Sequence, residues 1–350
     1  MNWNKKGAKG VAMFNRDRGQ EGSVLVAVLW SLFFLAALAV VLHILITPQL
    51  GLAARLRDRV VLRYLAKAGI QRAVIEIRAD ETQDFDGLNE SWVNNEESFK
   101  EVGLTEEGYF SVKYLHFEGD EEEGDPRYGF IDEERKLNIN KAPEDVLKRF
   151  FEMTAELAAQ DASDIAGAIV DWRDADDEPS ENGAESYYYK ALPDGYPCKN
   201  ALFEVLEELR LVKGVTPAIF DKVKNRVTVY GRGLVNINTA DAVVLESIGF
   251  GTSLVEKIIT YRNGNDGEEG TEDDLAFEKA DSIIPTLSSA KGLLPEESGE
   301  MEAALERGIV GVRSENFHGY SLGKFRDEDM TVGIEFVMTR DEQVRFWKEE

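Results

Sequence analysis

The chain has 350 residues, and its 66 acidic side chains outnumber its 40 basic ones, so its formal net charge is −26 at pH 7. This charge disfavours a nucleic-acid partner, because binding to a phosphate backbone requires a basic surface that displaces counterions. The only cysteine, Cys198, excludes an intrachain disulfide and is expected to be a small buried side chain. The sequence contains no P-loop and no glycine-rich dinucleotide loop, and no histidine lies near Cys198 or a Gly-x-Ser-x-Gly turn in sequence, so we expect a protein without enzymatic activity.

A basic leader precedes a long uncharged apolar segment. The leader, residues 1–22, ends at Gly22, and the apolar run covers residues 23–46. At about 1.5 Å per residue this run forms a helix of about 36 Å, enough to cross a hydrocarbon core of about 30 Å. The basic residues of the leader predict that it stays in the cytoplasm and that everything after about Thr47 lies outside: Lys5, Lys6, Lys9, Arg16 and Arg18.

Three kinds of N-terminal signal compete for this segment. An ordinary secretory signal peptide is disfavoured, because its apolar region is shorter and ends in a small-residue cleavage site. A plain signal anchor remains open. The residues directly before the run, Arg18 to Ser23, favour a prepilin-type signal. Such a signal is cut after a glycine, here Gly22, so that Ser23 becomes the first residue of the mature chain and the apolar segment is retained.

The rest of the chain predicts one domain inserted into another. An amphipathic helix over 50–77 is expected to pack on a sheet through an apolar stripe at three- to four-residue spacing. Alternating patterns predict strands at 109–117 and 127–132, separated by an acidic turn, and again at 308–313, 319–325, 330–338 and 343–347. The fold expected is α+β: a long N-terminal helix packed on an antiparallel sheet, with a large all-α domain inserted between strands. The predicted stripe residues are Leu52, Leu56, Val60, Tyr64, Ala68 and Val74.

These patterns also set the expected domain boundaries. Residues 1–22 are the leader and 23–46 the transmembrane part of the first helix. Residues 47–136 and 300–350 form the two parts of the sheet domain, because neither part alone has enough strands for a stable sheet. Residues 137–299 form the inserted helical domain.

The inserted domain contains a repeat of helix-hairpin-helix type. Residues 137–147 and 235–245 each begin with an Asn-x-Asn motif, and a later helix in each copy ends in an aromatic residue followed by Arg173 or Arg262. We expect the asparagines and Thr239 to cap helices. Helix-hairpin-helix modules usually contact DNA, so the alternative function is an inner-membrane-anchored protein that binds DNA or another periplasmic partner. The acidic residues around both hairpins oppose DNA binding.

The segment 171–186 has the composition of a calcium loop. Calcium takes six to eight oxygen ligands, which clustered carboxylates on a flexible loop supply. The offsets of Gly183 and the last glutamate do not fit an EF-hand. A solvated acidic loop, or an Asp171–Arg173 pair, remains an alternative, and the second acidic loop, 263–274, is expected to be plain loop. The predicted metal ligands are Asp171, Asp174, Asp176, Asp177 and Glu185.

Five ordered motifs resemble the general secretion pathway protein K family, the large minor pseudopilins of type II secretion. The resemblance extends from about Gly19 over nearly the whole chain, and its motifs follow the leader glycine and apolar helix: 132–140, 171–176, 183–185, 208–214 and 235–240. It implies a pilin-like domain with a helical insertion, bound calcium, and a single-pass protein of the inner membrane with its C-terminal domain in the periplasm.

The resemblance also implies a place and partners. The protein would sit at the tip of the type II secretion pseudopilus, nucleate its assembly for protein export, and contact the I- and J-type minor pseudopilins, the major pseudopilin and the inner-membrane assembly platform. Prepilin peptidase would cut after Gly22 and methylate Ser23. The fifth mature residue would be Ala27, where most pilins carry a glutamate that pairs with a neighbouring subunit's N-terminal amine. The K family lacks this glutamate, as expected of a subunit with none above it.

Overall fold

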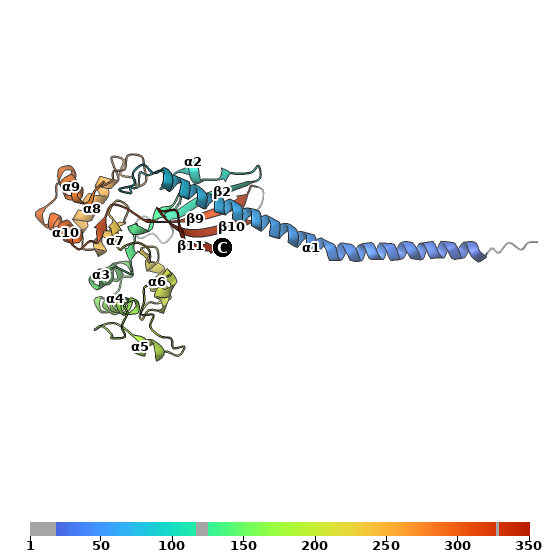
Figure 1. Ribbon diagram of the computed structural model, residues 1–350, viewed down its shortest axis with the longest axis horizontal. Helices are drawn as coiled ribbons and strands as arrows, with labels where there is room; N and C mark the ends of the chain where they lie inside the picture. Colours follow the sequence, from blue (N-terminus) through green and yellow to red (C-terminus); the bar gives the residue numbers. More distant parts are fainter. Residues whose placement is uncertain (1–18, 117–124, 327–328) are drawn as a thin grey trace, which may run out of the picture. The chain divides into compact units, whose positions relative to one another are not determined.

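The structure is a computed structural model that describes residues 19–116, 125–326 and 329–350 (Figure 1). The basic residues of the predicted leader and most of the predicted acidic turn lie outside these residues. The chain divides into two compact units, Met1–Val60 and Val61–Glu350, which are described separately below.

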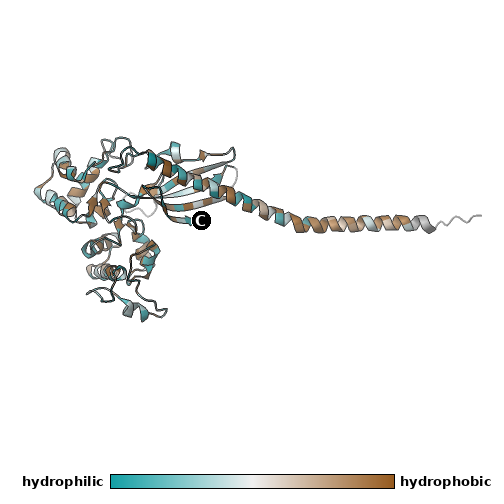
Figure 2. Cartoon of the chain, in the orientation of Figure 1, coloured by the Kyte–Doolittle hydropathy of each residue, from teal (hydrophilic) through white to brown (hydrophobic). Residues whose placement is uncertain are grey.

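The first helix, α1, spans Gly19–Ala79 and carries the apolar segment. Its N-terminal part is mostly brown, the colour of hydrophobic residues, in Figure 2, and from Val24 to Ile46 its large apolar side chains are exposed. By length and composition, Ser23–Ala79 is the one described helix that could cross a membrane, with a mean hydropathy of 2.8 in its most apolar window. The finding supports a single membrane anchor.

The C-terminal part of α1 packs against a sheet through residues at helical spacing. Its buried stripe begins at Leu62 and includes Ile70 and Ile77. The helix lies close to strand β9 because glycines leave room: a Cβ at Gly69 would lie 2.1 Å from Ser321 Oγ. Ser321 Oγ donates a hydrogen bond of 2.7 Å to the Ala66 carbonyl.

The predicted stripe is wrong at its first four positions. Leu52, Leu56, Val60 and Tyr64 are exposed, whereas Val74 is buried. Helical periodicity alone identifies an apolar face, but it does not show where along the helix the sheet begins.

The sheet is antiparallel and has seven strands in the described part of the chain. Its main order is β1-β2-β9-β10-β11, with β3 added to β2 and β4 added to β9. The strands are β1 (Val102–Gly103), β2 (Gly108–His116), β3 (Asp125–Tyr128), β4 (Ile131–Asp132), β9 (Asn316–Phe325), β10 (Thr331–Thr339) and β11 (Val344–Glu349). The short helix α2 (Glu96–Phe99) precedes β1.

Alternation along the strands directs one face of the sheet toward α1. In β10 the alternate residues Ile334, Phe336 and Met338 are fully buried in the cluster that α1 completes. Trp92, in the loop after α1, stacks on Phe130 with ring centroids 5.6 Å apart. Burying a large apolar side chain stabilises the fold by about 1.5–3 kcal/mol, so this aromatic cluster is a principal source of stability for the sheet domain.

A mainly helical block lies between β4 and β9 in the chain. Its own hydrophobic cluster runs from Leu137 to Val312. The predicted boundary at 299 therefore comes too early, and it falls inside helix α10. The elements of the block are η1 (Glu133–Arg135), β5 (Leu137–Asn138), α3 (Glu144–Thr154), α4 (Ala159–Arg173), α5 (Ser186–Lys190), η2 (Leu206–Leu211), α6 (Pro217–Val223), β6 (Val227–Thr228), β7 (Val235–Asn236), α7 (Ala242–Ser247), α8 (Thr252–Arg262), η3 (Ala280–Ser282), α9 (Ile283–Lys291), α10 (Pro295–Glu306) and β8 (Val310–Gly311).

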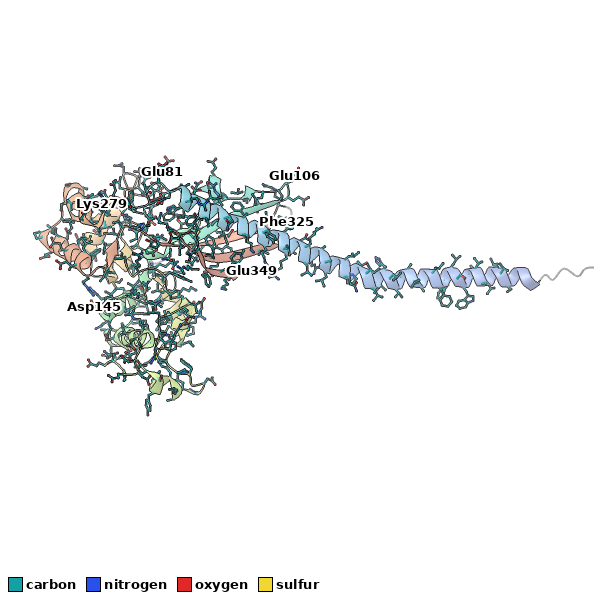
Figure 3. All side chains as sticks on the ribbon, in the orientation of Figure 1. Glu81, Glu106, Asp145, Lys279, Phe325 and Glu349 are labelled. Carbon is teal, nitrogen blue, oxygen red and sulfur yellow. The ribbon has the colours of Figure 1, made fainter. Side chains whose placement is uncertain are left out.

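The sequence repeat is also a structural repeat. Each half opens with a two-residue strand that pairs in parallel with a strand at the end of the same half, β5 with β6 and β7 with β8. The predicted strand 308–313 thus contributes to the block rather than to the main sheet. Figure 3 labels Asp145 on α3, whose carboxylate accepts a hydrogen bond of 2.9 Å from Arg307, just after α10. This contact ties the two halves together.

The repeated asparagines do not cap helices, contrary to the prediction. Asn140 donates to the Phe203 carbonyl and accepts from the Phe203 amide, at 3.0 and 2.8 Å. Asn238 makes the same pair of bonds with Phe277, also at 3.0 and 2.8 Å. Each asparagine therefore holds a distant loop to the start of its repeat, and helix α7 is capped instead by Asp241.

The repeated arginines have a matching role. Arg173 donates to the Ile139 and Ala142 carbonyls, and Arg262 donates to the Ile237 and Ala240 carbonyls. In each copy, one of these carbonyls belongs to the middle residue of the Asn-x-Asn motif and the other lies two residues after the motif. The aromatic-Arg signature thus satisfies buried backbone groups. The predicted α+β architecture, a helix on an antiparallel sheet with a helical block inserted between strands, is confirmed.

Candidate metal centre

Three of the five predicted metal ligands come together at the C-terminal end of helix α4. Asp171 lies in the last turn of α4, Asp174 follows its last residue, and Glu185 directly precedes α5. One carboxylate oxygen from each lies within 4.8 Å of the other two. Asp171 and Glu185 are buried, with exposed fractions of 1% and 3%.

The intervening loop folds tightly over Asp171. The Ser180 amide faces both Asp171 carboxylate oxygens, at 3.3 and 3.2 Å. Gly183 passes so close that a Cβ there would lie 1.8 Å from Asp171 Oδ2. A glycine is therefore required at position 183 for the loop to close over this carboxylate.

Two side chains of the centre have buried oxygens without a donor. Neither Glu185 Oε1 nor Oε2 has a hydrogen-bond partner among the described residues, and the same holds for Ser180 Oγ. A buried carboxylate without donors is costly, so an unseen cation or proton must compensate it. Ser180 is the residue that the sequence reasoning missed. Its neutral hydroxyl has no distinctive motif, and only the fold places it next to Asp171.

The electrostatics of the centre are those of uncompensated negative charge. Burial, together with the charges of Asp171, Asp174 and Asp177, raises the pKa of Glu185 to about 7. Burial also raises the pKa of Asp174. Arg173 does not neutralise the group, because its guanidinium is turned toward the Ile139 and Ala142 carbonyls.

The other two predicted ligands serve the loop backbone. Asp176 Oδ1 accepts a hydrogen bond of 3.0 Å from the Glu178 amide, and Asp177 Oδ1 accepts one of 3.2 Å from the Ser186 amide. Neither belongs to the group of three. Asn200, whose amide nitrogen donates to the Asp176 carbonyl, has a buried side-chain oxygen without a donor.

This donor set fits a hard divalent cation. All of its donors are oxygens, three are carboxylates, and a loop rather than a rigid strand carries most of them, as calcium prefers. Cys198 is buried next to the centre, where its Sγ lies 3.8 Å from the Asp171 carbonyl. Burial raises the pKa of this thiol to about 12, so it remains protonated.

The predicted processing residues lie at the start of α1. Gly22 and Ser23 are both within the helix, and Ala27 lies one turn further on, where its carbonyl accepts a hydrogen bond of 2.9 Å from Ser31 Oγ. Ser23 and Ala27 are exposed.

The second acidic loop, 263–274, closes on itself. Asp273 Oδ2 accepts hydrogen bonds from the Asn265 and Asp266 amides, at 2.6 and 3.3 Å. These bonds, with one from Thr271, lower the pKa of Asp273 to about 2. Asp273 is therefore a loop-closing acceptor.

Comparison with known proteins finds a family match over the first half of the inserted block. Residues 126–232, which include the candidate centre, match the family model described as type II secretion system (T2SS), protein K. Over 93 residues the chain is 33% identical to the type II secretion system protein K of Pectobacterium carotovorum subsp. carotovorum. That alignment covers 27% of this chain and 28% of the relative, so the chain spans little more than a quarter of the relative's length.

The fold is similar to a solved structure over most of the chain. A chain of the GspK-GspI-GspJ complex from the enterotoxigenic Escherichia coli type 2 secretion system superimposes with a TM-score of 0.61 at 16% identity. The match covers 86% of this chain and 99% of the other. At this identity the likeness concerns the fold, which is pilin-like with an inserted helical block. Over residues 126–232, the resemblance to the type II secretion protein K family that the motifs indicate is confirmed by the family model.

Proposed function

We propose that this chain is a minor pseudopilin of a type II secretion system, a structural and non-enzymatic subunit at the tip of the pseudopilus. The observation that carries this proposal is the match of residues 126–232 to the protein K family, inside a fold that combines α1 with an antiparallel sheet. The inserted block distinguishes a K-type subunit from a simple pilin.

The membrane segment supports the same role. A single apolar helix directly follows Gly22, and prepilin peptidase would leave that helix in the mature protein. We propose that the remainder of the chain lies in the periplasm, since the leader carries the positive charges that retain a segment in the cytoplasm. The major pseudopilin and the inner-membrane platform would then contact α1.

Ala27 supports a terminal position in the assembly. A glutamate in a membrane segment is tolerable only when its charge is paired. Ala27 cannot pair with the N-terminal amine of a neighbour, and a subunit that nothing covers has no need of that contact. We therefore propose that this chain is the first subunit assembled, beside I- and J-type minor pseudopilins.

Assembly can be tested with the full chain in detergent. Co-expression with the I- and J-type minor pseudopilins of the same organism, followed by affinity capture on this chain, should recover both partners together. Capture should fail when only the membrane part of α1, residues 23–46, is replaced by the membrane helix of an unrelated signal-anchor protein and the rest of the chain is intact. Recovery of neither partner with the native chain would contradict the proposal.

We further propose that Asp171, Asp174 and Glu185 bind one calcium ion. Ser180 Oγ is an additional buried oxygen of the same loop without a hydrogen-bond partner among the described residues, and Gly183 allows the loop to close over Asp171. The ion would neutralise the carboxylates and hold loop 174–185 against α4. The role is structural, because its ligands lie in the interior of the block rather than at an open catalytic site.

Calcium binding can be measured directly by calorimetric titration of the full chain in detergent. The native chain should bind calcium, and Glu185→Gln should bind it at least tenfold more weakly, because one charged ligand is lost. Glu181→Gln is a matched control that removes the same charge from an exposed position of the same loop. Equal weakening by both variants would show a general charge effect and would contradict a site at Glu185.

Binding of DNA is the alternative function of a helix-hairpin-helix block. The net charge of −26 opposes it. In addition, the Asn-x-Asn and Arg motifs serve internal hydrogen bonds rather than an exposed hairpin. We do not favour this function.

A further inference from the structure

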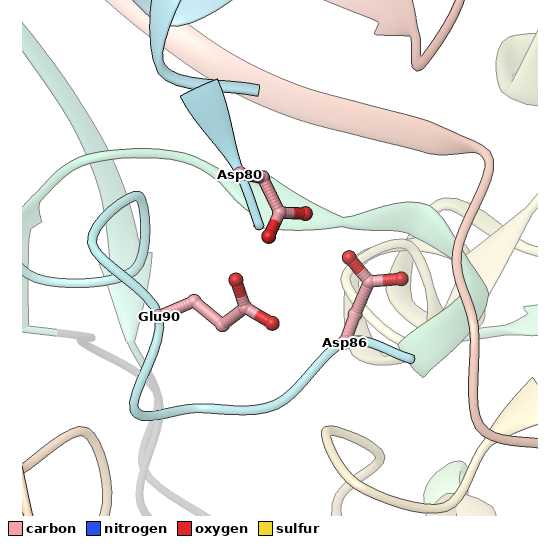
Figure 4. A group of neighbouring side chains, drawn as sticks. All are labelled: Asp80, Asp86 and Glu90. Atoms are coloured by element: carbon pink, nitrogen blue, oxygen red, sulfur yellow. The ribbon is translucent and has the colours of Figure 1, made fainter. Parts of the chain in front are cut away.

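A second group of three acidic side chains lies outside the candidate metal centre, where α1 ends. Asp80 directly follows α1, and Asp86 and Glu90 lie in the loop after it (Figure 4). One carboxylate oxygen from each lies within 4.8 Å of the other two. All three point toward a common centre in Figure 4.

Two of these carboxylates share one guanidinium. Arg340, at the turn after β10, donates from Nη1 to Asp80 Oδ2 at 2.9 Å and from Nη2 to Asp86 Oδ1. Asp86 Oδ2 also accepts a hydrogen bond of 2.7 Å from the Ser314 amide. The Arg340 side chain is only 7% exposed and those of Asp80 and Asp86 are 3% and 0% exposed, so this is a buried ion triad rather than an open cation site.

The Thr82 hydroxyl contacts two carboxyl groups, and both contacts can be hydrogen bonds only if Glu90 is protonated. Thr82 Oγ1 lies 2.8 Å from Asp80 Oδ1 and 2.8 Å from Glu90 Oε1. A hydroxyl has one proton and can donate it to only one of these oxygens. The other contact is stable only if the carboxyl group carries a proton and donates it to Oγ1. Asp80 is ionised because it pairs with Arg340, which leaves Glu90 as the acid.

We infer that Glu90 is a protonated carboxylic acid at neutral pH. It donates a hydrogen bond to Thr82, which donates one to Asp80. This chain of hydrogen bonds, called the relay below, holds the loop after α1 in place. The inference does not depend on the proposed secretion role. Burial and the charge of Asp80 raise the pKa of Glu90 to about 8, which agrees with the hydrogen-bond geometry. The charged groups that face the relay are Asp80, Asp86 and Arg340, with Asp132 of β4 adjacent to Asp86.

The relay lies where the loop joins the inserted block. The Asp86 amide donates to the Val312 carbonyl at 2.8 Å, and the Asp86 carbonyl accepts from Asn236 Nδ2 at 3.3 Å. Loss of the proton would place two adjacent carboxylates in one poorly solvated site, and their repulsion would loosen the loop. The proton on Glu90 therefore stabilises the contact between the loop after α1 and the end of the inserted block.

Infrared difference spectroscopy of the full chain in detergent tests the protonation directly. The spectrum of the native chain minus that of Glu90→Gln at pH 7 should contain the carbonyl stretch of one carboxylic acid. This band should disappear as the pH rises through about 8. The matched control is Glu97→Gln, which changes an exposed glutamate on α2 and should leave the carboxylic acid band of the native chain in place. A carboxylate difference for Glu90→Gln at pH 7 would overturn the inference.

The pH dependence of unfolding provides a second, independent measure. A Glu90 that is protonated when folded and ionised when unfolded makes stability fall as pH rises between its two pKa values. Between about pH 5.5 and about pH 7.5, the unfolding constant of the native chain should rise about tenfold more per pH unit than that of Glu90→Gln. Equal slopes would contradict the relay.

Substitution of the middle residue separates the relay from simple packing. Thr82→Val keeps the size of the side chain but removes the hydroxyl, and it should speed hydrogen exchange of the Asp86 amide at pH 7. Thr82→Ser keeps the hydroxyl and should leave that exchange rate close to native. Identical exchange in the two variants would show that the hydroxyl does not hold the loop.

Discussion

In each of two groups of three carboxylates, one oxygen from every side chain lies within 4.8 Å of the other two, but the neighbours of the two groups differ. Beside Asp171 and Glu185, the Arg173 guanidinium is turned toward backbone carbonyls, and both Glu185 oxygens lack a donor among the described residues. Around Asp80 and Asp86 the structure places Arg340, and Thr82 links Asp80 to Glu90. Acid density alone therefore does not identify a metal site. What distinguishes the two is whether the protein itself supplies the positive charge and the protons.

The largest effect should come from removing the guanidinium of the second group. Arg340→Met leaves Asp80 and Asp86 buried without a cation, and breaking a buried pair in this way costs about 3–5 kcal/mol of unfolding free energy. Denaturant unfolding of the full chain in detergent measures it. Arg78→Met is the control, since Arg78 pairs with Glu342 at an exposed position and its loss should change stability little. Equal losses of unfolding free energy in the two variants would contradict the distinction between a buried triad and a surface pair.

Chelation should distinguish the two groups by mass action. At a calcium concentration of 100 times its Kd, a bound ion stabilises the native chain by about 2.7 kcal/mol, which EDTA removes. Thermal unfolding with and without EDTA should show this difference in the native chain and in Glu90→Gln, but not in Glu185→Gln. A chelator response that Glu90→Gln loses and Glu185→Gln keeps would reverse the two assignments.

The tight passage at Gly183 offers a change that leaves every carboxylate in place. Gly183→Ala puts a methyl group 1.8 Å from Asp171 Oδ2, so loop or carboxylate must move. The overpacking should cost about 1–3 kcal/mol and weaken calcium binding. Gly292→Ala is not a suitable control, because Gly292 has a φ of +67° and would be strained by any side chain. Gly299→Ala is suitable: nothing lies within 4 Å of its Cβ, and calcium binding should remain native.

The smallest effect is expected at Glu297, a carboxylate to which the protein itself supplies several hydrogen-bond donors. Lys257, the Leu294 amide and Ser253 lower the pKa of Glu297 to about 2. Such a group contributes stability above its unfolded pKa, near 4.5, and that contribution is lost as the pH falls toward 2. Glu297→Gln should therefore flatten the acid side of the stability profile, whereas Glu296→Gln, an exposed neighbour, should not. This sign is opposite to that expected for Glu90. If the stability of Glu297→Gln fell at low pH as steeply as that of the native chain, the proposed contribution of Glu297 would be contradicted.

Local patterns predicted the elements of this fold well. The apolar run, the alternation in β9 and β10, and the repeated Asn-x-Asn segments all depend on residues close in sequence. The prediction of a buried stripe is wrong at Leu52, Leu56 and Val60, because an apolar helical stripe forms equally in a helix that meets no sheet.

The sequence alone does not predict contacts between residues that are far apart in the chain. The asparagine motif was misinterpreted as helix caps because Phe203, the partner of Asn140, is 63 residues away. Arg340 and Asp80, which define the second acidic group, are separated by 260 residues. At the candidate metal centre, spacing indicated Asp171, Asp174 and Glu185, but only the turn of the loop shows that Asp176 and Asp177 face the backbone instead.

The central claim, that this chain is a minor pseudopilin, is tested most directly at its N-terminus. Mass spectrometry of the protein isolated from its native membrane would identify the first residue of the mature chain. The account predicts a chain that begins at N-methylated Ser23, because prepilin peptidase would cut after Gly22 and would leave the apolar part of α1 as the anchor. A mature chain that still begins at Met1 would contradict the account.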